Sequence, residues 1–267
     1  MKTVGLTHYN FPGSMEEFLD YMVDTGFSYT EIQGRDVWGA DEDPDKAKRN
    51  AGKLRKLLEA RGLYASGVSA GNNFTVLGEE AMAAEVSRVR TGCDVAQILG
   101  TKILRVDGGW PAADLPQEKW TGLMVEGFRR CTDFAEAAGL TLALDNHGVT
   151  TNDIEVQLEI LRQVESPCMG ANLDTMNYRW YGYDLETIRD IYKRIAPYVR
   201  HTHFKDGRGS RAEYVGTALG EGEIDLQWAL DCLKAVGYEG PWCVEYEGTT
   251  DSREGFRKGL EYLRARI

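Results

Sequence analysis

Basic residues are outnumbered by acidic ones in this sequence. The chain has 31 Lys and Arg against 42 Asp and Glu, which gives a formal net charge of −11 and a pI near 5.0. Proteins that bind DNA or RNA concentrate Lys and Arg where they meet the phosphates. The composition therefore argues against a nucleic-acid partner, and it leaves a small uncharged substrate open.

Long apolar runs and paired cysteines are also lacking. The N-terminus enters a predicted strand without the apolar segment of a signal peptide, and no stretch has the length of a membrane span. We therefore expect a soluble cytoplasmic protein with no membrane partner. The cysteines are odd in number and far apart, without a C-x-x-C pair, which indicates free thiols in a reducing compartment. They are Cys93, Cys131, Cys168, Cys232 and Cys243.

No Pro/Ser-rich linker or low-complexity segment divides the chain, and strand and helix patterns alternate from end to end. Hydrophobic residues make up 42% of the 267 residues, enough for a sizeable core. Strands are expected at residues 3–7, 30–33, 63–69, 102–106, 140–145, 169–174, 198–204 and 241–246. Eight strand–helix units of this total length predict an α/β fold, a single (β/α)8 TIM barrel that forms one domain over residues 1–267. An open doubly wound sheet is the alternative, but no strand leads into a Gly-rich phosphate loop.

Helix boundaries carry their own signals. Ser14 and Glu17 form a capping-box pattern, Pro44 is placed for a first helical turn, and Gly100 ends an amphipathic stretch. Further helix starts are expected at Pro116, at Asn152–Glu155, at Asp184 and at Asp225. These signals give each predicted strand a following helix.

Histidine is rare, and its placement is informative. The chain has four: His8, His147, His201 and His203. All four fall on or just after predicted strands, whereas incidental surface histidines would also fall on helices. Because active sites of such barrels lie at the C-terminal ends of the strands, the distribution predicts a shared site there.

Strand alternation selects a more specific set of side chains. Alternate residues of a strand share a face, so the leucines of strands five and six face the helices while an acidic residue faces the barrel axis. The residues expected to converge on the axis from strands five to eight are Asp145, Asp174, His203 and Glu245. Buried carboxylates need pairing or a metal, so this set predicts a divalent cation site with mixed oxygen and nitrogen ligands. Separate salt bridges are the alternative, for example between Asp145 or Glu245 and Arg105 or Lys205.

Five segments at predicted strand ends resemble one known family. They are Leu-Ala-Leu-Asp-Asn-His-Gly, Asn-Leu-Asp-Thr-Met-Asn, His-Thr-His-Phe-Lys-Asp, Gly-Glu-Gly-Glu-Ile-Asp and Val-Glu-Tyr-Glu. In this order they resemble the sugar phosphate isomerase/epimerase family, which shares a xylose isomerase-like TIM barrel with endonuclease IV. The resemblance implies metal ligands at Asp145, Asp174, His203 and Glu245.

The chain departs from that family at two positions. Asp145 stands where the family usually has Glu, so its shorter side chain is expected to ligate less closely or through water. Asn177 stands where many family epimerases have a substrate-binding His. The identity of the substrate is therefore not carried over from those members.

The implied activity is that of a metal-dependent isomerase or epimerase. It would act on a ketose or related sugar by abstracting a proton next to a carbonyl, through an enediolate. The expected acid/base residues are Glu245 first, then Asp145, with His147 as a rival base or a hydrogen-bond donor to substrate. Mn²⁺ is the favoured ion, with Mg²⁺, Co²⁺ and Zn²⁺ as alternatives.

Other activities remain open at this stage. A lyase or dehydratase on the same barrel would eliminate from a keto-sugar, keto-inositol or 3-keto-glycoside after the same proton abstraction, with His147 protonating the leaving group. A non-catalytic sugar-binding barrel is a third option. DNA repair, as in endonuclease IV, would need more histidines and a less acidic chain.

The partner expected from these residues is a small carbohydrate without a phosphate group, since no Gly-rich phosphate cradle is present. Trp110 is one of several loop aromatics on which a sugar ring would pack. Arg105 and Lys205 have two readings, substrate contact or internal ion pair. The substrate-binding candidates are His8, Arg105, Asn177, Lys205 and Trp110. The sequence does not decide between a monomer and a homo-oligomer.

Overall fold

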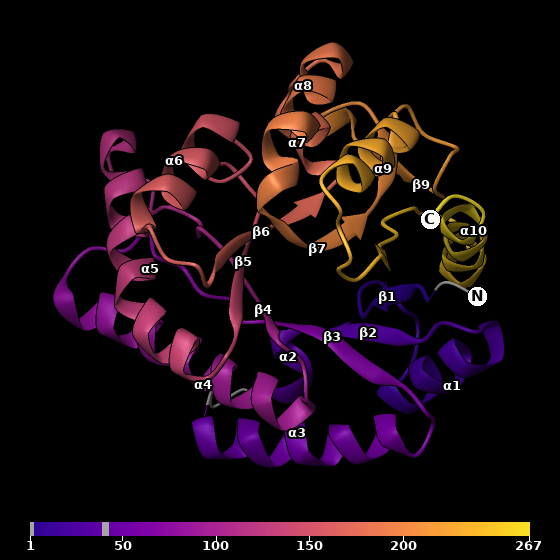
Figure 1. Ribbon diagram of the computed structural model, residues 1–267, viewed down its shortest axis with the longest axis horizontal. Helices are drawn as coiled ribbons and strands as arrows, with labels where there is room; N and C mark the ends of the chain where they lie inside the picture. Colours follow the sequence, from indigo (N-terminus) through magenta and orange to yellow (C-terminus); the bar gives the residue numbers. More distant parts are fainter. Residues whose placement is uncertain (1–2, 39–42) are drawn as a thin grey trace.

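Parallel strands close into a barrel at the centre of the molecule. The computed structural model describes residues 3–38 and 43–267 (Figure 1). Within these residues the barrel order is β1-β10-β7-β6-β5-β4-β3-β2, so the first and last strands are neighbours. The strands are β1 (Gly5–Thr7), β2 (Tyr29–Ile32), β3 (Tyr64–Ser69), β4 (Ile103–Val106), β5 (Thr141–Asp145), β6 (Met169–Asp174), β7 (Val199–Phe204) and β10 (Cys243–Val244). The predicted (β/α)8 TIM barrel is confirmed.

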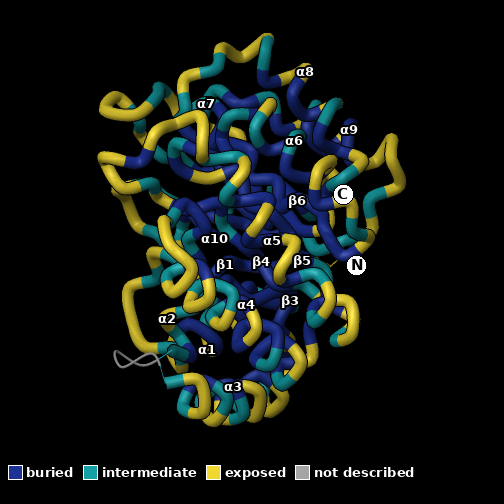
Figure 2. The backbone as a smooth tube through the Cα atoms, turned by 90° about the vertical axis from the view of Figure 1, so that its left-hand side faces the viewer, coloured by how far each residue is buried: buried dark blue, intermediate teal, exposed yellow. Residues whose placement is uncertain are grey.

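Helices surround this barrel and bury its outer face (Figures 1 and 2). Outward-facing strand residues such as Leu142, Leu144 and Leu173 are fully buried against them. The main helices are α1 (Met15–Thr25), α3 (Pro44–Glu59), α4 (Glu79–Leu99), α5 (Trp120–Ala137), α6 (Ile154–Val164), α8 (Leu185–Ile195), α9 (Leu226–Ala235) and α10 (Ser252–Arg264). Within the described residues, none of the helices is long and apolar enough to cross a membrane.

Most of the predicted helix boundaries are confirmed. Ser14 and Glu17 form the capping box of α1, Pro44 lies in the first turn of α3, and Gly100 ends α4 with a φ of 78°. The predicted start of α6 was one residue early, because the side chain of Asp153, not that of Asn152, caps the helix. After Pro116 a 3₁₀ turn, η1 (Gln117–Lys119), precedes α5.

Several short elements lie in loops where the sequence gave no periodic signal. They are α2 (Gly34–Val37), α7 (Asn177–Tyr181), the 3₁₀ turns η2 (Ala196–Tyr198) and η3 (Arg211–Glu213), and an antiparallel hairpin of β8 (Asp206–Arg208) and β9 (Val215–Thr217). Three of them, α2, α7 and the hairpin, follow barrel strands directly. They therefore border the end of the barrel at which the candidate site lies.

Strand register decides which polar side chains meet inside the barrel. Asp145 of β5 pairs with Asn172 of β6, and Asp174 of β6 pairs with His203 of β7. Val244 of β10 pairs with Phe204 of β7, which places Glu245 one step beyond, next to the end of β7. The register thus brings the polar ends of β5, β6, β7 and β10 together.

Candidate active site

A cavity of about 240 Å³ opens at the C-terminal ends of the barrel strands. Its lining is almost entirely polar. The lining residues are Thr7, Tyr9, Gln33, Arg105, Asp145, His147, Asp174, Asn177, His203, Glu245 and Glu247. A polar cavity at this end of a (β/α)8 barrel is the usual position of an active site.

Three of the four predicted ligands meet at the base of this cavity. Asp174, His203 and Glu245 each offer a donor atom, and these atoms lie within 4.8 Å of one another. The Nδ1 atom of His203 lies 3.0 Å from Oε2 of Glu245. All three side chains are at least 90% buried. The strand alternation that predicted their convergence therefore matches the geometry.

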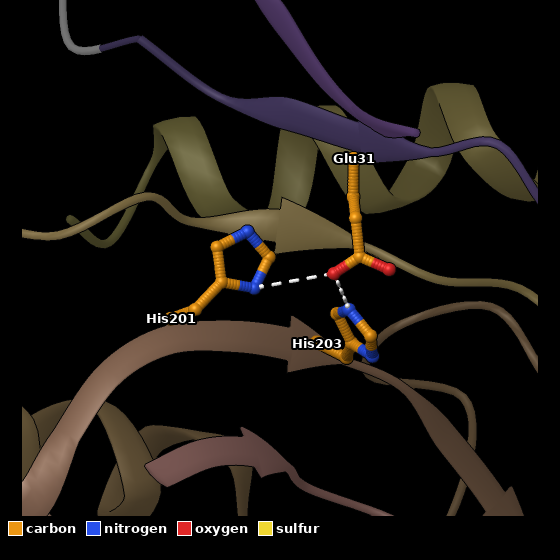
Figure 3. A group of neighbouring side chains, drawn as sticks. All are labelled: Glu31, His201 and His203. Atoms are coloured by element: carbon orange, nitrogen blue, oxygen red, sulfur yellow. Dashed lines mark hydrogen bonds and ion pairs between the residues drawn. The ribbon is translucent and has the colours of Figure 1, made fainter. Parts of the chain in front are cut away.

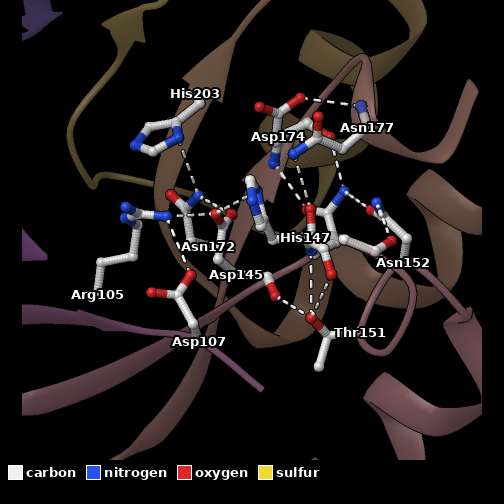
Figure 4. A network of polar contacts seen from close by, with 12 residues as sticks. Arg105, Asp107, Asp145, His147, Thr151, Asn152, Asn172, Asp174, Asn177 and His203 are labelled. Carbon is white, nitrogen blue, oxygen red and sulfur yellow. Dashed lines mark hydrogen bonds and ion pairs between the residues drawn. The ribbon is translucent and has the colours of Figure 1, made fainter. Parts of the chain in front are cut away.

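Asp145, the fourth predicted ligand, is turned to other partners. Its Oδ2 atom accepts a hydrogen bond of 2.5 Å from Arg105, and its Oδ1 atom accepts one of 2.5 Å from Nδ2 of Asn172 (Figure 4). Among the described residues it is not part of the group of close donor atoms. The salt bridge weighed as the alternative for Asp145 is thus present.

Lys205 contacts two carboxylates of the proposed ligand group, Asp174 and Glu245. Its Nζ atom lies 2.9 Å from Asp174, 3.2 Å from Glu245 and 3.4 Å from Glu247. Burial disfavours the ammonium, but the three carboxylates outweigh burial and raise the pKa of Lys205 well above its usual value. Both alternatives considered for Glu245, a place in a ligand group and an ion pair, are therefore present in one arrangement.

Glu31 lies behind His203 and contacts two buried histidines. The Nε2 atom of His203 lies 2.7 Å from Oε2 of Glu31, and Nδ1 of His201 lies 3.5 Å from the same oxygen (Figure 3). Burial would raise the pKa of Glu31, but His203 and Arg105 outweigh it and lower that pKa to about 2. Burial dominates for His201 and lowers its pKa to about 4, so this imidazole is neutral.

Arg105 bridges the buried carboxylates of Glu31 and Asp145. Its Nε atom lies 3.1 Å from Glu31, while one terminal nitrogen contacts Asp145 at 2.5 Å and Asp107 at 3.3 Å. A second terminal nitrogen donates to Oγ of Ser69 at 2.8 Å. The guanidinium is therefore held by protein groups on several sides. Of the two roles expected for Arg105, this arrangement is the internal ion pair.

His147 and Asn177 line the cavity, and Trp110 lies against His147. The half-exposed His147 side chain has Nδ1 3.8 Å from Oδ2 of Asp145, and its ring meets Trp110 edge to face at 5.8 Å. Trp110 itself is 54% exposed. Asn177 lines the cavity and is anchored, since its Nδ2 donates to the backbone oxygen of Asn146 at 2.9 Å. These positions suit contacts with a bound substrate.

His8 lies apart from this group. Its Nδ1 atom contacts Asp36 at 2.8 Å, and its ring packs on Phe18 with centroids 4.4 Å apart. It is not among the described residues that line the cavity. The structure therefore gives His8 a role at the N-terminal end of α2, and its predicted contact with substrate is not supported by the cavity lining.

Sequence reasoning did not include two residues that organise the site, Glu31 and Asn172. Both lie inside barrel strands as fully buried polar residues. Asn172 donates to Asp145 and accepts from Nδ1 of His201 at 2.9 Å, so it links β5 to β7. One signal could have found them: each is a charged or amide side chain on the face of its strand that points to the barrel axis.

The donor set at the cavity base fits a divalent cation. Two carboxylates and one imidazole from three strand ends are typical of a catalytic metal site with three protein ligands and an open position. Burial raises the pKa of Asp174 to about 6, which shows that this carboxylate lacks solvent stabilisation. A divalent cation at this position would add to the positive charge that Lys205 already brings to these carboxylates. The ligands that fit are Asp174, His203 and Glu245, and Asp145 would first have to leave Arg105.

The comparisons with known proteins agree on the architecture. A family model described as xylose isomerase-like TIM barrel matches residues 19–266. The chain is 24% identical over 233 residues to the uncharacterized protein MJ1311 of Methanocaldococcus jannaschii, which covers 80% of this chain and 77% of that one. It is 27% identical over 171 residues to an inosose dehydratase of Geobacillus thermodenitrificans, 55% of either chain, so it spans about half the length of that relative.

Solved structures share the fold over almost the whole chain. L-ribulose 3-epimerase superposes with a TM-score of 0.78 and 19% identity, over 99% of this chain and 94% of that one. The IolI protein, solved with a binding zinc atom, superposes with a TM-score of 0.79 and 17% identity, over 100% and 98%. At these identities the superpositions establish a common fold.

Proposed function

The chain belongs to the family of xylose isomerase-like TIM barrels, and from this premise we propose that it is a metal-dependent isomerase or epimerase of a ketose or related sugar. The observation that carries the proposal is the group Asp174, His203 and Glu245 at the base of a polar cavity. Similar folds that belong to sugar epimerases support it.

The proposed ion would be held by Asp174, His203 and Glu245. A divalent ion bound there would supply Lewis-acid stabilisation for the negative charge that develops on a carbonyl oxygen when the neighbouring carbon loses its proton. We favour Mn²⁺ for this ligand set and retain Mg²⁺, Co²⁺ and Zn²⁺ as alternatives. The bound zinc of the IolI structure is consistent with such a site in this fold.

Proton transfer is assigned to Glu245 first. Its carboxylate lines the cavity, and Lys205 and His203 hold it in place at 3.2 Å and 3.0 Å. Lys205 and His203 outweigh burial and lower the pKa of Glu245, so the carboxylate is ionised, as a proton acceptor must be. Asp145 is a weaker second base, because both of its oxygens already accept short hydrogen bonds.

The charge of the cavity favours an uncharged substrate. Among the described lining residues, the permanent cation is Arg105, and it already contacts Glu31, Asp107 and Asp145. A phosphate would therefore meet an excess of carboxylates without a free cation to receive it. The volume of about 240 Å³ lies below the range of about 300–1,000 Å³ that is typical of drug-sized ligands and suits a monosaccharide.

A second candidate is a dehydratase or other lyase acting on a keto-inositol or keto-sugar. The observation that favours it is the difference between His147 and Asp145. The His147 side chain is half-exposed, whereas Asp145 is buried and held by Arg105. A carboxylate base and an imidazole acid on different parts of the substrate suit loss of a β-hydroxyl after proton abstraction. The 27% identity to an inosose dehydratase supports this candidate.

Product analysis in D₂O tests both functions. Protein loaded with Mn²⁺ is incubated with hexuloses, pentuloses and keto-inositols, and the products are followed by NMR and mass spectrometry. We expect deuterium at one carbon with the carbon skeleton and its oxygens intact for an isomerase or epimerase, and loss of water for a dehydratase. Tight metal binding without exchange at any carbon of any substrate would contradict both and favour a binding protein.

The proposed ligand set has a separate test. His203→Ala removes the single imidazole of the group, and we expect it to lose most bound metal and all turnover, as measured by metal analysis after dialysis and by the D₂O assay. His8→Ala is the matched control for metal content, because His8 contacts Asp36 and Phe18 instead. Metal retained at the wild-type level in His203→Ala would place the ion elsewhere.

A further inference from the structure

Glu31 is a buried carboxylate that the proposed chemistry does not use. It lies in β2, is fully buried, and is not among the described residues that line the cavity. A substrate in the cavity therefore meets His203 and not the carboxylate behind it. Its function must be sought in what it contacts within the protein.

The two oxygens of Glu31 have separate partners. Oε1 accepts a hydrogen bond from Nε2 of Gln33 at 2.8 Å and forms an ion pair with Nε of Arg105 at 3.1 Å. Oε2 faces Nε2 of His203 at 2.7 Å (Figure 3). The hydrogen bond from Gln33 and the ion pair with Arg105 hold the carboxylate, so Oε2 stays in position for the imidazole.

The imidazole of His203 in turn faces two different surroundings. Nε2 points to Glu31, and Nδ1 lies 3.0 Å from Glu245 within the proposed ligand group. Ligation of a metal ion requires His203 in its neutral form, which carries its proton on one ring nitrogen and a lone pair on the other. A proton on Nε2, donated to Glu31, leaves the lone pair on Nδ1, toward Asp174 and Glu245.

The same geometry disfavours a second ion between Glu31, His201 and His203, although their donor atoms also lie within 4.8 Å of one another. His201 is neutral and uses both ring nitrogens, Nδ1 with Asn172 at 2.9 Å and Nε2 with Ser66 at 3.2 Å. Its hydrogen bonds are satisfied inside the barrel. Glu31, His201 and His203 therefore form an internal hydrogen-bonding group and not a second metal site.

We propose that Glu31 is a positioning residue for the metal site: it accepts the Nε2–H of His203 and so fixes the tautomer and ring orientation that direct Nδ1 to the divalent ion. The inference rests on the proposed function. Ligating histidines commonly donate their second ring N–H to a carboxylate, and loss of such a partner costs about 10- to 100-fold in metal affinity. Glu31 thereby acts through His203 and touches neither ion nor substrate.

The test compares Glu31→Gln with the wild-type protein in metal affinity. Binding of Mn²⁺ and Zn²⁺ is measured by calorimetry or chelator competition, and we expect affinity to fall about 10- to 100-fold in the variant. Glu223→Gln is the matched control, because Glu223 binds Arg179 and the backbone of Gly209, away from the ligands. Its affinity should equal that of the wild type.

A measurement on the wild type keeps the test decisive if Glu31→Gln does not fold. In protein labelled with ¹⁵N and loaded with Zn²⁺, ring correlations of His203 should show a proton on Nε2 and none on Nδ1. The opposite pattern, or unchanged affinity in a folded Glu31→Gln, would overturn the role of Glu31 and leave the proposed function standing. A wild-type protein that binds no divalent ion would overturn both.

Discussion

At the scale of single residues, Asp206 explains how a glycine-rich loop is held beside the candidate site. Its buried carboxylate follows Lys205 and accepts four backbone N–H groups from the segment that leads to α9. The donors are Gly207, Gly220, Gly222 and Ile224, at 2.9, 2.9, 3.0 and 3.3 Å. The last residue of His-Phe-Lys-Asp therefore anchors the loop, while His203 at its start lines the cavity.

The closeness of this loop to Asp206 predicts the effect of Gly222→Ala. An added Cβ would lie 2.0 Å from Oδ1 of Asp206 and 2.6 Å from the nitrogen of Gly207, so the loop must shift and lose hydrogen bonds. We expect the free energy of unfolding to fall by about 1–3 kcal/mol, measured by urea denaturation.

Gly122→Ala is the control for that substitution. Gly122 lies in α5, and an added Cβ would meet no atom within 4 Å. Because Ala favours helix over Gly by about 1 kcal/mol, this variant should be as stable as the wild type or more so. Equal loss in both variants would contradict the crowding argument.

At the scale of elements, aspartates at helix starts account for part of the acidic composition. The N-cap residues of α3, α6, α8, α9 and α10 are all aspartates whose side chains accept backbone N–H groups of the first turn. They are Asp43, Asp153, Asp184, Asp225 and Asp251. A carboxylate at this position satisfies an open N–H and interacts favourably with the helix dipole. Some of the negative charge thus has a structural use.

Asp184 gives this argument a pH dependence. It accepts the N–H of Thr187 at 2.7 Å, and the backbone hydrogen bond lowers its pKa in the folded protein. A lowered folded pKa means that the stabilisation is complete above the unfolded pKa and is lost as the pH falls through the folded one. Asp184→Ala should therefore lower the melting temperature at pH 7, and the difference from wild type should shrink in strongly acidic buffer.

The matched control is Asp190→Ala, which removes the same group from an exposed position in the middle of α8. We expect no fall in the melting temperature at pH 7, since an interior helical position favours Ala over Asp. If both variants melted alike at every pH, the cap would not be the source of the effect.

At the scale of the whole molecule, the barrel and its strand faces were predictable from the sequence, while the pairing of charges inside it was only partly so. Periodicity and caps depend on neighbours in the chain, and they located every barrel strand to within a few residues. Asp145 shows the limit: alternation placed it on the axis, but its partner Arg105 is 40 residues away. Which of several axial groups it contacts depends on register between strands, and sequence spacing does not supply that register.

The short elements were missed for a different reason. α2 and α7 are four and five residues long, too short for a helical period, and the β8–β9 hairpin is held by the loop around Asp206. The sequence indicated no role for Glu31, because its role depends on His203, 172 residues away. Long-range contacts of this kind define the site.

Burial of the free thiols is a whole-molecule property with its own test. All five cysteines are free and buried, and burial raises the pKa of Cys93 to about 12. Because the thiolate is the reactive form, we expect no rapid reaction of the folded protein with a thiol-specific chromogenic reagent at pH 8, and five reacting thiols in guanidinium chloride. Rapid labelling of a thiol in the folded state would contradict the burial described for it.

The pairing of β1 with β10 has a consequence for how the protein is made. Gly5 lies beside Cys243, so β1 waits for β10, the last strand of the barrel, before its second edge is covered. Until then the growing sheet exposes open edges that invite association with other chains. Glu245 follows β10 directly, so the chemistry we propose would begin only once the last strand of the barrel is in place.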